Sequence, residues 1–313
     1  IIEGFFLVML ANIGMEGGLV FYNSFLPEIA EKEYQGRVSA WGYAVGYAGS
    51  ILSLLIAIPL VKSGHYNETW FMVAVFFAVF SLPAFFFLPP DRKTGQTLLR
   101  SAGQGGKYSW KTLKEMWKHK ELRKFILSFL IYEDGVNTVI VFSSIFAATT
   151  LGFDAKELIG LYLIVQITAL VGAFIMAKPI DLWGPKKIVT LSLLMWSFVA
   201  VSAYFISLKS HFFILASFAG LGLGTVQAAS RAFFAQFIPL EHESEYFGVY
   251  SLVGKSSAIA GPIVFGYISS AVGSQRPAIL AVSVFFIIGL VLVQYVKGGG
   301  PNIEQSDKPM HDS

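Results

Sequence analysis

The chain has 313 residues, of which 55% are hydrophobic and only 14% are charged, and its mean hydropathy is +0.62. Soluble domains carry about 25% charged residues, so this composition excludes an ordinary soluble domain and predicts that lipid surrounds most of the chain. The net charge of +3 is small, and the absence of cysteine excludes disulfides and thiolate metal sites. The five histidines are scattered without ligand spacing, so we expect no metal site. We also expect no cofactor and no nucleic-acid partner.

Nine stretches have the length and apolar character that a spanning helix requires, about 20 residues. They predict an all-α polytopic membrane protein. The stretches run over residues 4–26, 39–61, 69–89, 125–148, 158–177, 188–208, 211–237, 247–272 and 277–296.

The distribution of Lys and Arg predicts the orientation of these helices, because cytoplasmic loops carry an excess of both. Ten of the 23 Lys and Arg residues fall in the single loop 90–124, and most of the others fall on the same side of the predicted bundle. Only Lys62, Lys156, Lys209 and Arg276 fall on the opposite side. We therefore expect the N-terminus outside and the C-terminus inside, with residues 297–313 as a disordered cytoplasmic tail.

The basic loop 90–124 divides the chain. Within it, Trp110, Leu113 and Trp117 share one helical face and lysines surround them, a pattern typical of an amphipathic helix on an anionic membrane surface. We expect such a helix at 108–123 on the inner leaflet, although a simple tether between two parts of the protein fits the same residues.

An internal repeat relates residues 25–49 to residues 237–261 at a constant offset of 212 positions. Ten identities occur in these 25 gapless positions, including Pro27 with Pro239 and Gly42 with Gly254. The same offset leaves residues 125–208 without a counterpart in the chain. We therefore expect two six-helix halves, with residues 1–89 as the last three helices of the first half and 125–296 as the whole second half. This is the plan of major facilitator transporters, with nine of twelve helices present.

Several segments resemble the vacuole-effluxer-like branch of the major facilitator superfamily. They are 12–23, 25–29, 36–39, 132–138, 227–231 and 247–262. The resemblance implies a transporter, whose yeast members are implicated in amino-acid export from the vacuole. It also implies that the helices 4–26, 125–148 and 211–237 line a central cavity.

Charged residues inside spanning helices are costly and are functional candidates by default. The candidates for substrate binding or ion coupling are Glu16, Glu133, Asp134, Asn137, Thr138, Gln227, Arg231 and Lys255. From the helical rise we expect the charged members to converge near the middle of the membrane. We expect the shared face of Asp134, Asn137 and Thr138 to contact the substrate, and one of the three carboxylates to carry a coupling proton. Structural ion pairs between the two halves remain the alternative.

The superfamily's cytoplasmic signature is only partly kept: Ala177 stands where glycine is usual, followed by Asp181, Gly184 and Lys186. We expect the last three to form a cytoplasmic gate. In this arrangement Asp181 would hold the N-terminus of the 247–272 helix near Tyr246, together with Arg231.

The sequence thus predicts a secondary transporter that moves a small polar solute such as an amino acid. It would work by alternating access as a monomer, in a bacterial plasma membrane or, in a eukaryote, a vacuolar membrane. A receptor or scaffold on a transporter fold is the alternative, since a fold does not fix a function. A membrane enzyme is not expected, because no embedded histidine lies near a carboxylate or a serine pair.

Overall fold

The computed structural model describes residues 2–89, 98–239 and 242–298. Within these ranges the regular elements are all helical, and nine spans are long and apolar enough to cross a membrane. All nine correspond to the stretches predicted from the sequence. The disordered tail expected at 297–313 falls almost entirely outside the described residues, as does the start of the 90–124 loop.

The helices follow one another with short connections. Their bounds are α1 Ile2–Ser24, α2 Leu26–Ile29, α3 Gln35–Lys62, α4 Tyr66–Phe87, α5 Leu98–Lys118, α6 Lys120–Thr149, α7 Ala155–Trp183, α8 Pro185–Phe205, α9 Lys209–Ala235, α10 Glu243–Ser256, α11 Ala260–Val272 and α12 Gln275–Gln294.

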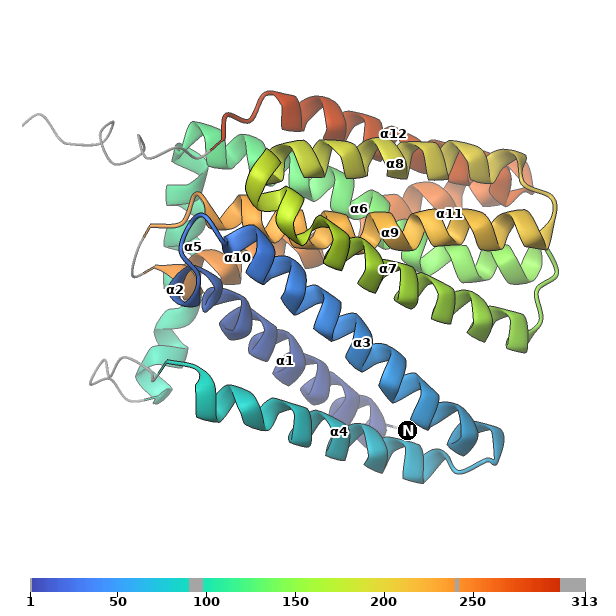
Figure 1. Ribbon diagram of the computed structural model, residues 1–313, viewed down its shortest axis with the longest axis horizontal. Coiled ribbons are helices and arrows are strands. Elements are labelled where there is room, and N and C mark those ends of the chain that lie inside the picture. Colours follow the sequence, from blue (N-terminus) through green and yellow to red (C-terminus); the bar gives the residue numbers. More distant parts are fainter. Residues whose placement is uncertain (1, 90–97, 240–241, 299–313) are drawn as a thin grey trace, which may run out of the picture.

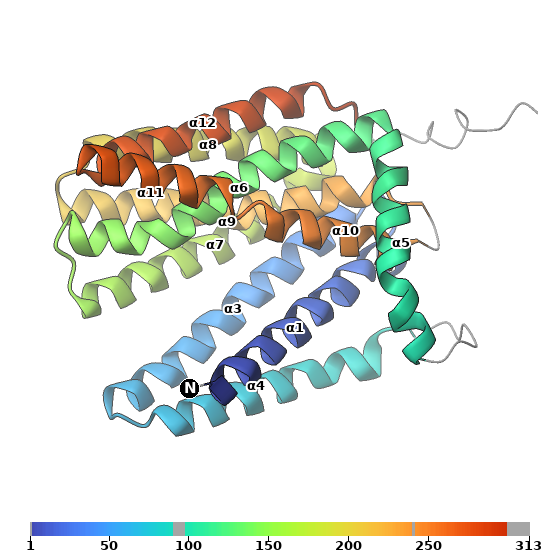
Figure 2. The ribbon, with the colours of Figure 1, turned by 180° about the vertical axis from the view of Figure 1, so that it is seen from behind.

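The spanning helices form two groups (Figures 1 and 2). We call α1–α4 the N-terminal bundle and α6–α12 the C-terminal bundle. The two bundles lie close together at the end where α5 crosses the molecule, and α1, α3 and α4 diverge from α6 and α9 toward the other end. The distribution of positive charge predicts that the α5 end is the cytoplasmic end. We call it the inner end and the opposite end the outer end.

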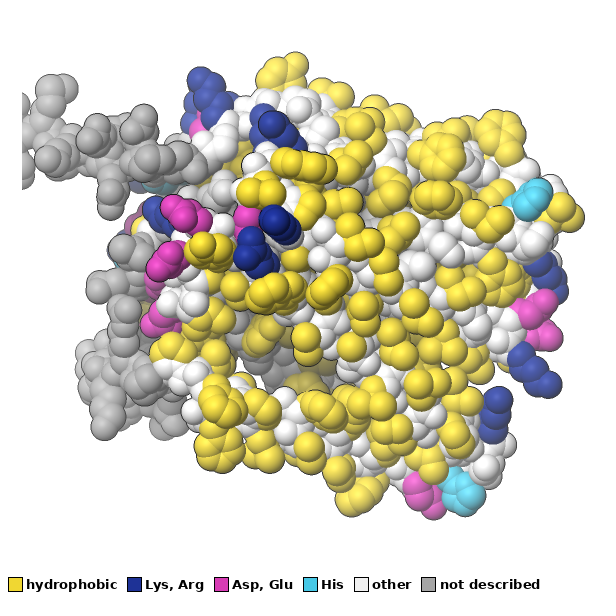
Figure 3. Space-filling model, in the orientation of Figure 1, with side chains coloured by type: hydrophobic (Ala, Val, Ile, Leu, Met, Phe, Trp, Pro, Cys, Tyr) yellow, Lys and Arg dark blue, Asp and Glu magenta, His cyan; other side chains and the backbone are white. Residues whose placement is uncertain are grey.

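The surface has the character expected of a protein embedded in lipid. Hydrophobic side chains cover the middle of the face in Figure 3, and charged side chains gather toward the two ends. Exposed phenylalanines on α4, such as Phe85 at 82% and Phe87 at 85%, would be unfavourable in water but match an acyl-chain environment.

Glycines allow the helices of the C-terminal bundle to approach closely. A Cβ atom on Gly224 of α9 would collide with the carbonyl oxygen of Ala169 on α7, and one on Gly172 would collide with Leu221. Small residues at such positions let backbones meet, which is how membrane helices gain packing energy without a hydrophobic driving force. The small-residue spacing of Gly220 and Gly224 is therefore a packing feature.

Contacts between the two bundles are reciprocal under the 212-residue repeat. The offset maps α1 onto α9, and α3 onto α10 and α11. In the structure α1 packs against α10, and α9 packs against α3. The α1–α10 pair and the α9–α3 pair are therefore equivalent under the repeat, as expected if a two-fold axis relates the two bundles.

The predicted helix 247–272 is not continuous. It is divided into α10 and α11 by a break at residues 257–259. The cause is Pro262 in the first turn of α11, because proline has no N–H and its ring clashes with the carbonyl group four residues earlier in a continuous helix. The break frees backbone N–H groups inside the membrane, and these need partners from elsewhere.

The amphipathic helix expected at 108–123 begins earlier and ends earlier than predicted. Residues 120–123 belong to α6, because the chain turns at His119. Leu113 packs on the protein, whereas Trp110 and Trp117 are exposed at 58% and 45%. The three side chains therefore do not share one environment.

Candidate functional site

Arg231 of α9 connects the two bundles. Its Nε and Nη2 donate to the hydroxyl and carbonyl oxygens of Ser39 on α3 at 2.9 and 2.6 Å, and its Nη1 donates to Oδ1 of Asn23 on α1 at 2.8 Å. The guanidinium lies 4.4 Å from the ring centroid of Tyr43. Arg231 is 4% exposed, and a Cβ on Gly42 would come within 3.0 Å of its Nη2. The glycine thus makes the space that this bridge occupies.

A second connection joins Tyr43 to Glu133 through Gln227. The tyrosine hydroxyl donates to Oε1 of Gln227 at 3.4 Å, and Nε2 of Gln227 donates to the Glu133 carboxylate at 2.8 Å. Glu133 is only 7% exposed, and within the described ranges no cation lies within salt-bridge distance of it. A buried carboxylate held by a neutral amide is an unusual arrangement in a membrane and marks Glu133 as a candidate for chemistry.

Glu16 and Lys255 form an ion pair between the bundles. Nζ of Lys255 on α10 lies 2.7 Å from Oε1 of Glu16 on α1, and the two side chains are 67% and 31% exposed. The pair therefore joins α1 of the N-terminal bundle to α10 of the C-terminal bundle.

Asp134 lies apart from these groups. Both of its carboxylate oxygens accept from the backbone N–H of Gly261 at 2.9 Å, so Asp134 caps the start of α11. Asn137 donates to Ser257 at 3.2 Å, and the Thr138 hydroxyl donates to the Asp134 carbonyl. The predicted face of α6 thus contacts the break between α10 and α11, and not Arg231.

The predicted gate position of Asp181 needs correction. Its carboxylate does not hold α10 near Tyr246 but lies against the N-terminus of α3. It accepts from the backbone N–H of Arg37 at 3.0 Å and pairs with the Arg37 guanidinium at 3.4 Å. A Cβ on Gly36 would lie 2.5 Å from the Asp181 carboxylate. Asp181 therefore lies at a helix N-terminus, as expected, but the helix is α3, which the repeat relates to the predicted helix α10.

The other two predicted gate residues have local roles. Gly184 has a φ of +86°, which joins α7 to α8 and which L side chains rarely adopt. Nζ of Lys186 donates to the carbonyl oxygens of Gln294 and Val296 at 2.8 and 2.6 Å, so this lysine caps the C-terminus of α12. Lys186 therefore stabilises the C-terminal bundle, and its contacts with the described residues do not reach the N-terminal bundle.

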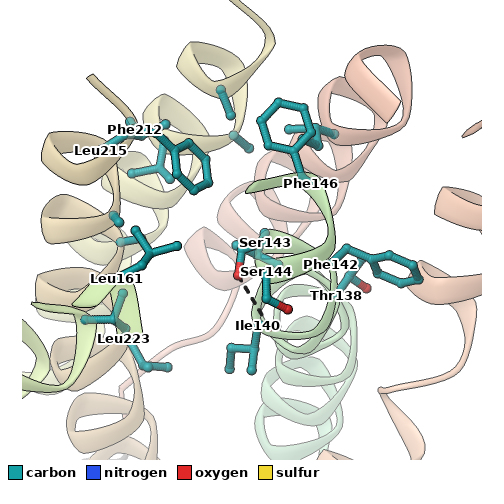
Figure 4. A pocket seen from close by; sticks show the side chains of 18 of the residues that line it. Thr138, Ile140, Phe142, Ser143, Ser144, Phe146, Leu161, Phe212, Leu215 and Leu223 are labelled. Carbon is teal, nitrogen blue, oxygen red and sulfur yellow. Dashed lines mark hydrogen bonds between the residues drawn. The ribbon is translucent and has the colours of Figure 1, made fainter. Parts of the chain in front are cut away.

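A cavity of about 470 Å³ lies inside the C-terminal bundle, between α6 and the helices α7, α8, α9 and α12 (Figure 4). Aromatic and aliphatic side chains such as Phe146, Leu161 and Phe212 surround it. Thr138, one of the predicted site residues, also lines it, but no charged side chain of the described chain does so. The cavity is lined mainly by apolar side chains, whereas the surface between the bundles carries the charged groups.

The charged candidates therefore do not converge into a single cluster. Glu133, Gln227, Arg231 and Lys255 lie along the surface between the bundles, together with Glu16, whereas Asp134 serves α11. Sequence reasoning missed three partners: Asn23, Ser39 and Tyr43. Asn23 stood at the end of a segment that carried the family resemblance, but nothing indicated its contact with a residue 208 positions away. No group of three or more His, Asp or Glu residues suited to a metal ion occurs in the part of the chain that the structure describes.

The polar contacts between the two spanning bundles all involve residues 16–43 of the N-terminal bundle in the described structure, which is its inner half.

The fold is that of the major facilitator class of membrane transporters. The crystal structure of the human organic anion transporter MFSD10 matches with a TM-score of 0.72 at 14% identity, covering 88% of this chain and 67% of that one. The E. coli fucose:proton symporter FucP matches with a TM-score of 0.68 at 14% identity, covering 89% and 73%.

The chain belongs to the family described as "Vacuole effluxer Atg22 like", whose profile matches residues 2–299. An uncharacterized MFS-type transporter of Bacillus subtilis, YxiO, is 27% identical over 91% of this chain and 68% of its own length. Autophagy-related protein 22 of Candida glabrata is 28% identical over 82% of this chain. The chain spans about half of that fungal relative, 53% of its length. The family and the nine apolar spans of the described residues identify the chain as an integral multi-pass membrane protein of a transporter family and not an enzyme.

Proposed function

We propose that this chain is part of a secondary transporter that moves a small zwitterionic solute, such as an amino acid, by alternating access. The observation that carries the proposal is that charged side chains of opposite sign lie on both bundles where the bundles meet. Glu133 and Lys255 lie on the C-terminal bundle, and Glu16 lies on the N-terminal bundle. In a transporter built from two bundles, the solute site lies where the bundles meet.

The two ends of a zwitterion have complementary partners here. Glu133 and the Gln227 side-chain oxygen accept hydrogen bonds and suit an ammonium group. Lys255 suits a carboxylate, which would take the place of Glu16 on the lysine. Binding would then exchange a contact between bundles for contacts with the solute, which links occupancy to movement of the bundles. The apolar cavity beside α6 offers no charged partner and does not serve these two ends.

Glu133 is our candidate for the coupling proton. Its carboxylate is buried, and its direct hydrogen-bond partner is the uncharged Gln227 amide. A charge in such a place is expensive, so proton uptake by Glu133 and departure of the bound ammonium group would favour each other. Asp134 is a weaker candidate, because both of its oxygens already accept from the backbone of α11.

The test uses the full-length transporter in proteoliposomes. Uptake of labelled amino acids is measured under a pH gradient, and exchange is measured without one. We expect Glu133→Gln to abolish accumulation driven by the gradient, because the amide cannot carry the proton. Exchange should remain measurable at a higher solute concentration, because the amide oxygen still accepts a hydrogen bond from the ammonium group but has lost the negative charge. Glu68→Gln, on the exposed face of α4, is the matched control and should behave as wild type. Gradient-driven accumulation by Glu133→Gln would refute the coupling role.

The same assay separates the transporter from the scaffold alternative. A scaffold gives neither uptake nor exchange with any solute tested, whatever the residue at position 133. A transporter exchanges at least one amino acid. If the Glu68→Gln control also accumulates that amino acid under the pH gradient, the result supports both transport and proton coupling.

A further inference from the structure

We propose that α5 is an anionic-lipid-binding helix, and that its partner is the phosphate-bearing headgroup layer of the inner leaflet. This inference concerns a surface far from the solute site, and it does not depend on the identity of the solute. It rests on the position of α5, on the arrangement of its lysines and on the packing of its opposite face.

The position of α5 places it at the level of the headgroups. Figures 1 and 2 show α5 crossing the end of the molecule at a steep angle to α6 and α12, beside α10. Because the spanning helices define the direction of the membrane normal, α5 lies roughly in the membrane plane where those helices end. It joins α6 directly through a turn at His119, so it cannot move far from that level.

The lysines of α5 form one stripe. Lys107, Lys111, Lys114 and Lys118 are spaced by four, three and four residues, so they project from a single face of the helix. Three of the four have no carboxylate partner among the described residues, and Lys111 has only a loose pair with Glu115 at 3.7 Å. A row of unpaired cations at the end of a membrane protein requires an anionic environment or open water.

The opposite face of α5 is fixed to the protein. Thr112 and Met116 are 2% and 0% exposed, and the Thr112 hydroxyl donates to Glu245 of α10 at 3.2 Å. Because the buried face lies about half a turn from the lysine stripe, packing on α10 points the lysines away from the bundle. The stripe is therefore an outward surface that the protein itself holds in place.

Two tryptophans distinguish a lipid surface from open water. Trp110 and Trp117 are exposed along one edge of the lysine stripe, and Nζ of Lys114 lies 5.4 Å from the Trp110 ring centroid. Exposed tryptophans are unfavourable in water but are enriched at membrane interfaces, where the ring is apolar and its N–H is hydrated. Lysines beside them would meet lipid phosphates, each contributing to attraction for an anionic leaflet.

The experiment measures the thermal stability of the full-length protein in a neutral detergent with added phosphatidylglycerol or phosphatidylcholine. We expect phosphatidylglycerol alone to raise Tm, with the effect weakened by 0.5 M salt as a surface charge interaction requires. In the quadruple variant K107Q/K111Q/K114Q/K118Q, the phosphatidylglycerol concentration for half the shift should rise about tenfold or more. The quadruple Lys→Arg variant should keep the wild-type response.

The matched control removes four exposed lysines elsewhere: K32Q/K62Q/K156Q/K187Q. It should respond to phosphatidylglycerol as wild type does. An equal response in the α5 Lys→Gln variant, or an equal response to phosphatidylcholine, overturns the proposal. So does the same shift with sodium phosphate at matched phosphate concentration, because the stripe would then bind a soluble anion.

A second measurement covers the case in which the Lys→Gln variant does not fold. Brominated phosphatidylglycerol quenches tryptophan fluorescence at short range. The fraction quenched should fall in W110F/W117F and should not fall in W70F, whose replaced tryptophan lies at the opposite end of the molecule on α4. Equal quenching in all three proteins overturns the proposal.

Discussion

Replacing Arg231 by glutamine should open the inner end of the transporter. The guanidinium makes three hydrogen bonds to Ser39 and Asn23 across the two bundles. Hydrogen bonds to a charged group contribute about 1.5–3 kcal/mol each, and glutamine can replace at most one of the three. We therefore expect a loss of about 3 kcal/mol from the inner-closed arrangement, which shifts its ratio to inner-open forms by roughly 150-fold.

The absence of cysteine from the described chain makes the assay direct. Spin labels at K32C and K187C report the separation of the bundles at the inner end, and labels at K62C and K156C report it at the outer end. All four lysines are exposed. In the R231Q background the inner distance should lengthen and the outer distance should shorten, as alternating access requires.

The control is Arg276→Gln. The Arg276 guanidinium also donates hydrogen bonds, to the Tyr204 carbonyl at 2.6 Å and to the Ser207 hydroxyl at 3.4 Å, but both partners belong to the C-terminal bundle. Its loss should lower stability and leave both distance distributions unchanged. If R231Q leaves the inner distance at its wild-type value, Arg231 is not what holds the inner end closed. If R276Q moves it equally, the effect is general destabilisation.

Three further predictions concern the other contacts. Gly36→Ala should weaken inner closure by about 1–3 kcal/mol, because the new methyl group collides with side chains of α7, whereas Gly46→Ala meets open space and should be neutral in the same spin-label assay. A double-mutant cycle of Glu16→Gln and Lys255→Gln, read by thermal unfolding, should give a coupling of about 0.2–1 kcal/mol because the pair is partly exposed, and a value near zero would mean that no pair forms. Asp134→Ala should lower the free energy of unfolding by about 1–2 kcal/mol through loss of the α11 cap. Asp134→Asn keeps an acceptor and should cost less; equal losses would exclude capping.

The sequence was sufficient to predict the helices because each needs only its own residues. Length, apolar character and the bias of Lys and Arg decide how many spans exist and how they are oriented. The break at 257–259 was the exception, although Pro262 carried a signal for it. A proline in a membrane helix is tolerated when other groups satisfy the freed N–H groups. The Gly261 N–H beside the break finds its acceptor in Asp134, 127 positions away, and the sequence does not indicate that contact.

The site was harder to predict because its contacts join residues from different bundles. The free-energy cost of a charged side chain in a spanning helix can be recognised from the residue's own segment. The sequence therefore identified Arg231 and Glu133 as unusual. The partners of Arg231 lie 192 and 208 positions away, and no periodicity relates them. The expectation that all charges meet at one depth assumed straight helices facing one axis, whereas Asp134 faces the α11 break.

The error over Asp181 has a cause that appears only in the structure. A carboxylate stabilises a helix N-terminus that lacks one, and the repeat offers two equivalent starts, those of α3 and α10. The first turn of α10 already carries Glu243 and Glu245, whereas the first turn of α3 has no acidic residue. The start without its own acid is the one that Asp181 contacts. The equivalent positions in the first copy, Glu31 and Glu33, are also glutamates, but they lie before the start of α3. The two helix starts therefore differ in where the helix begins, which the sequences of the two copies do not indicate.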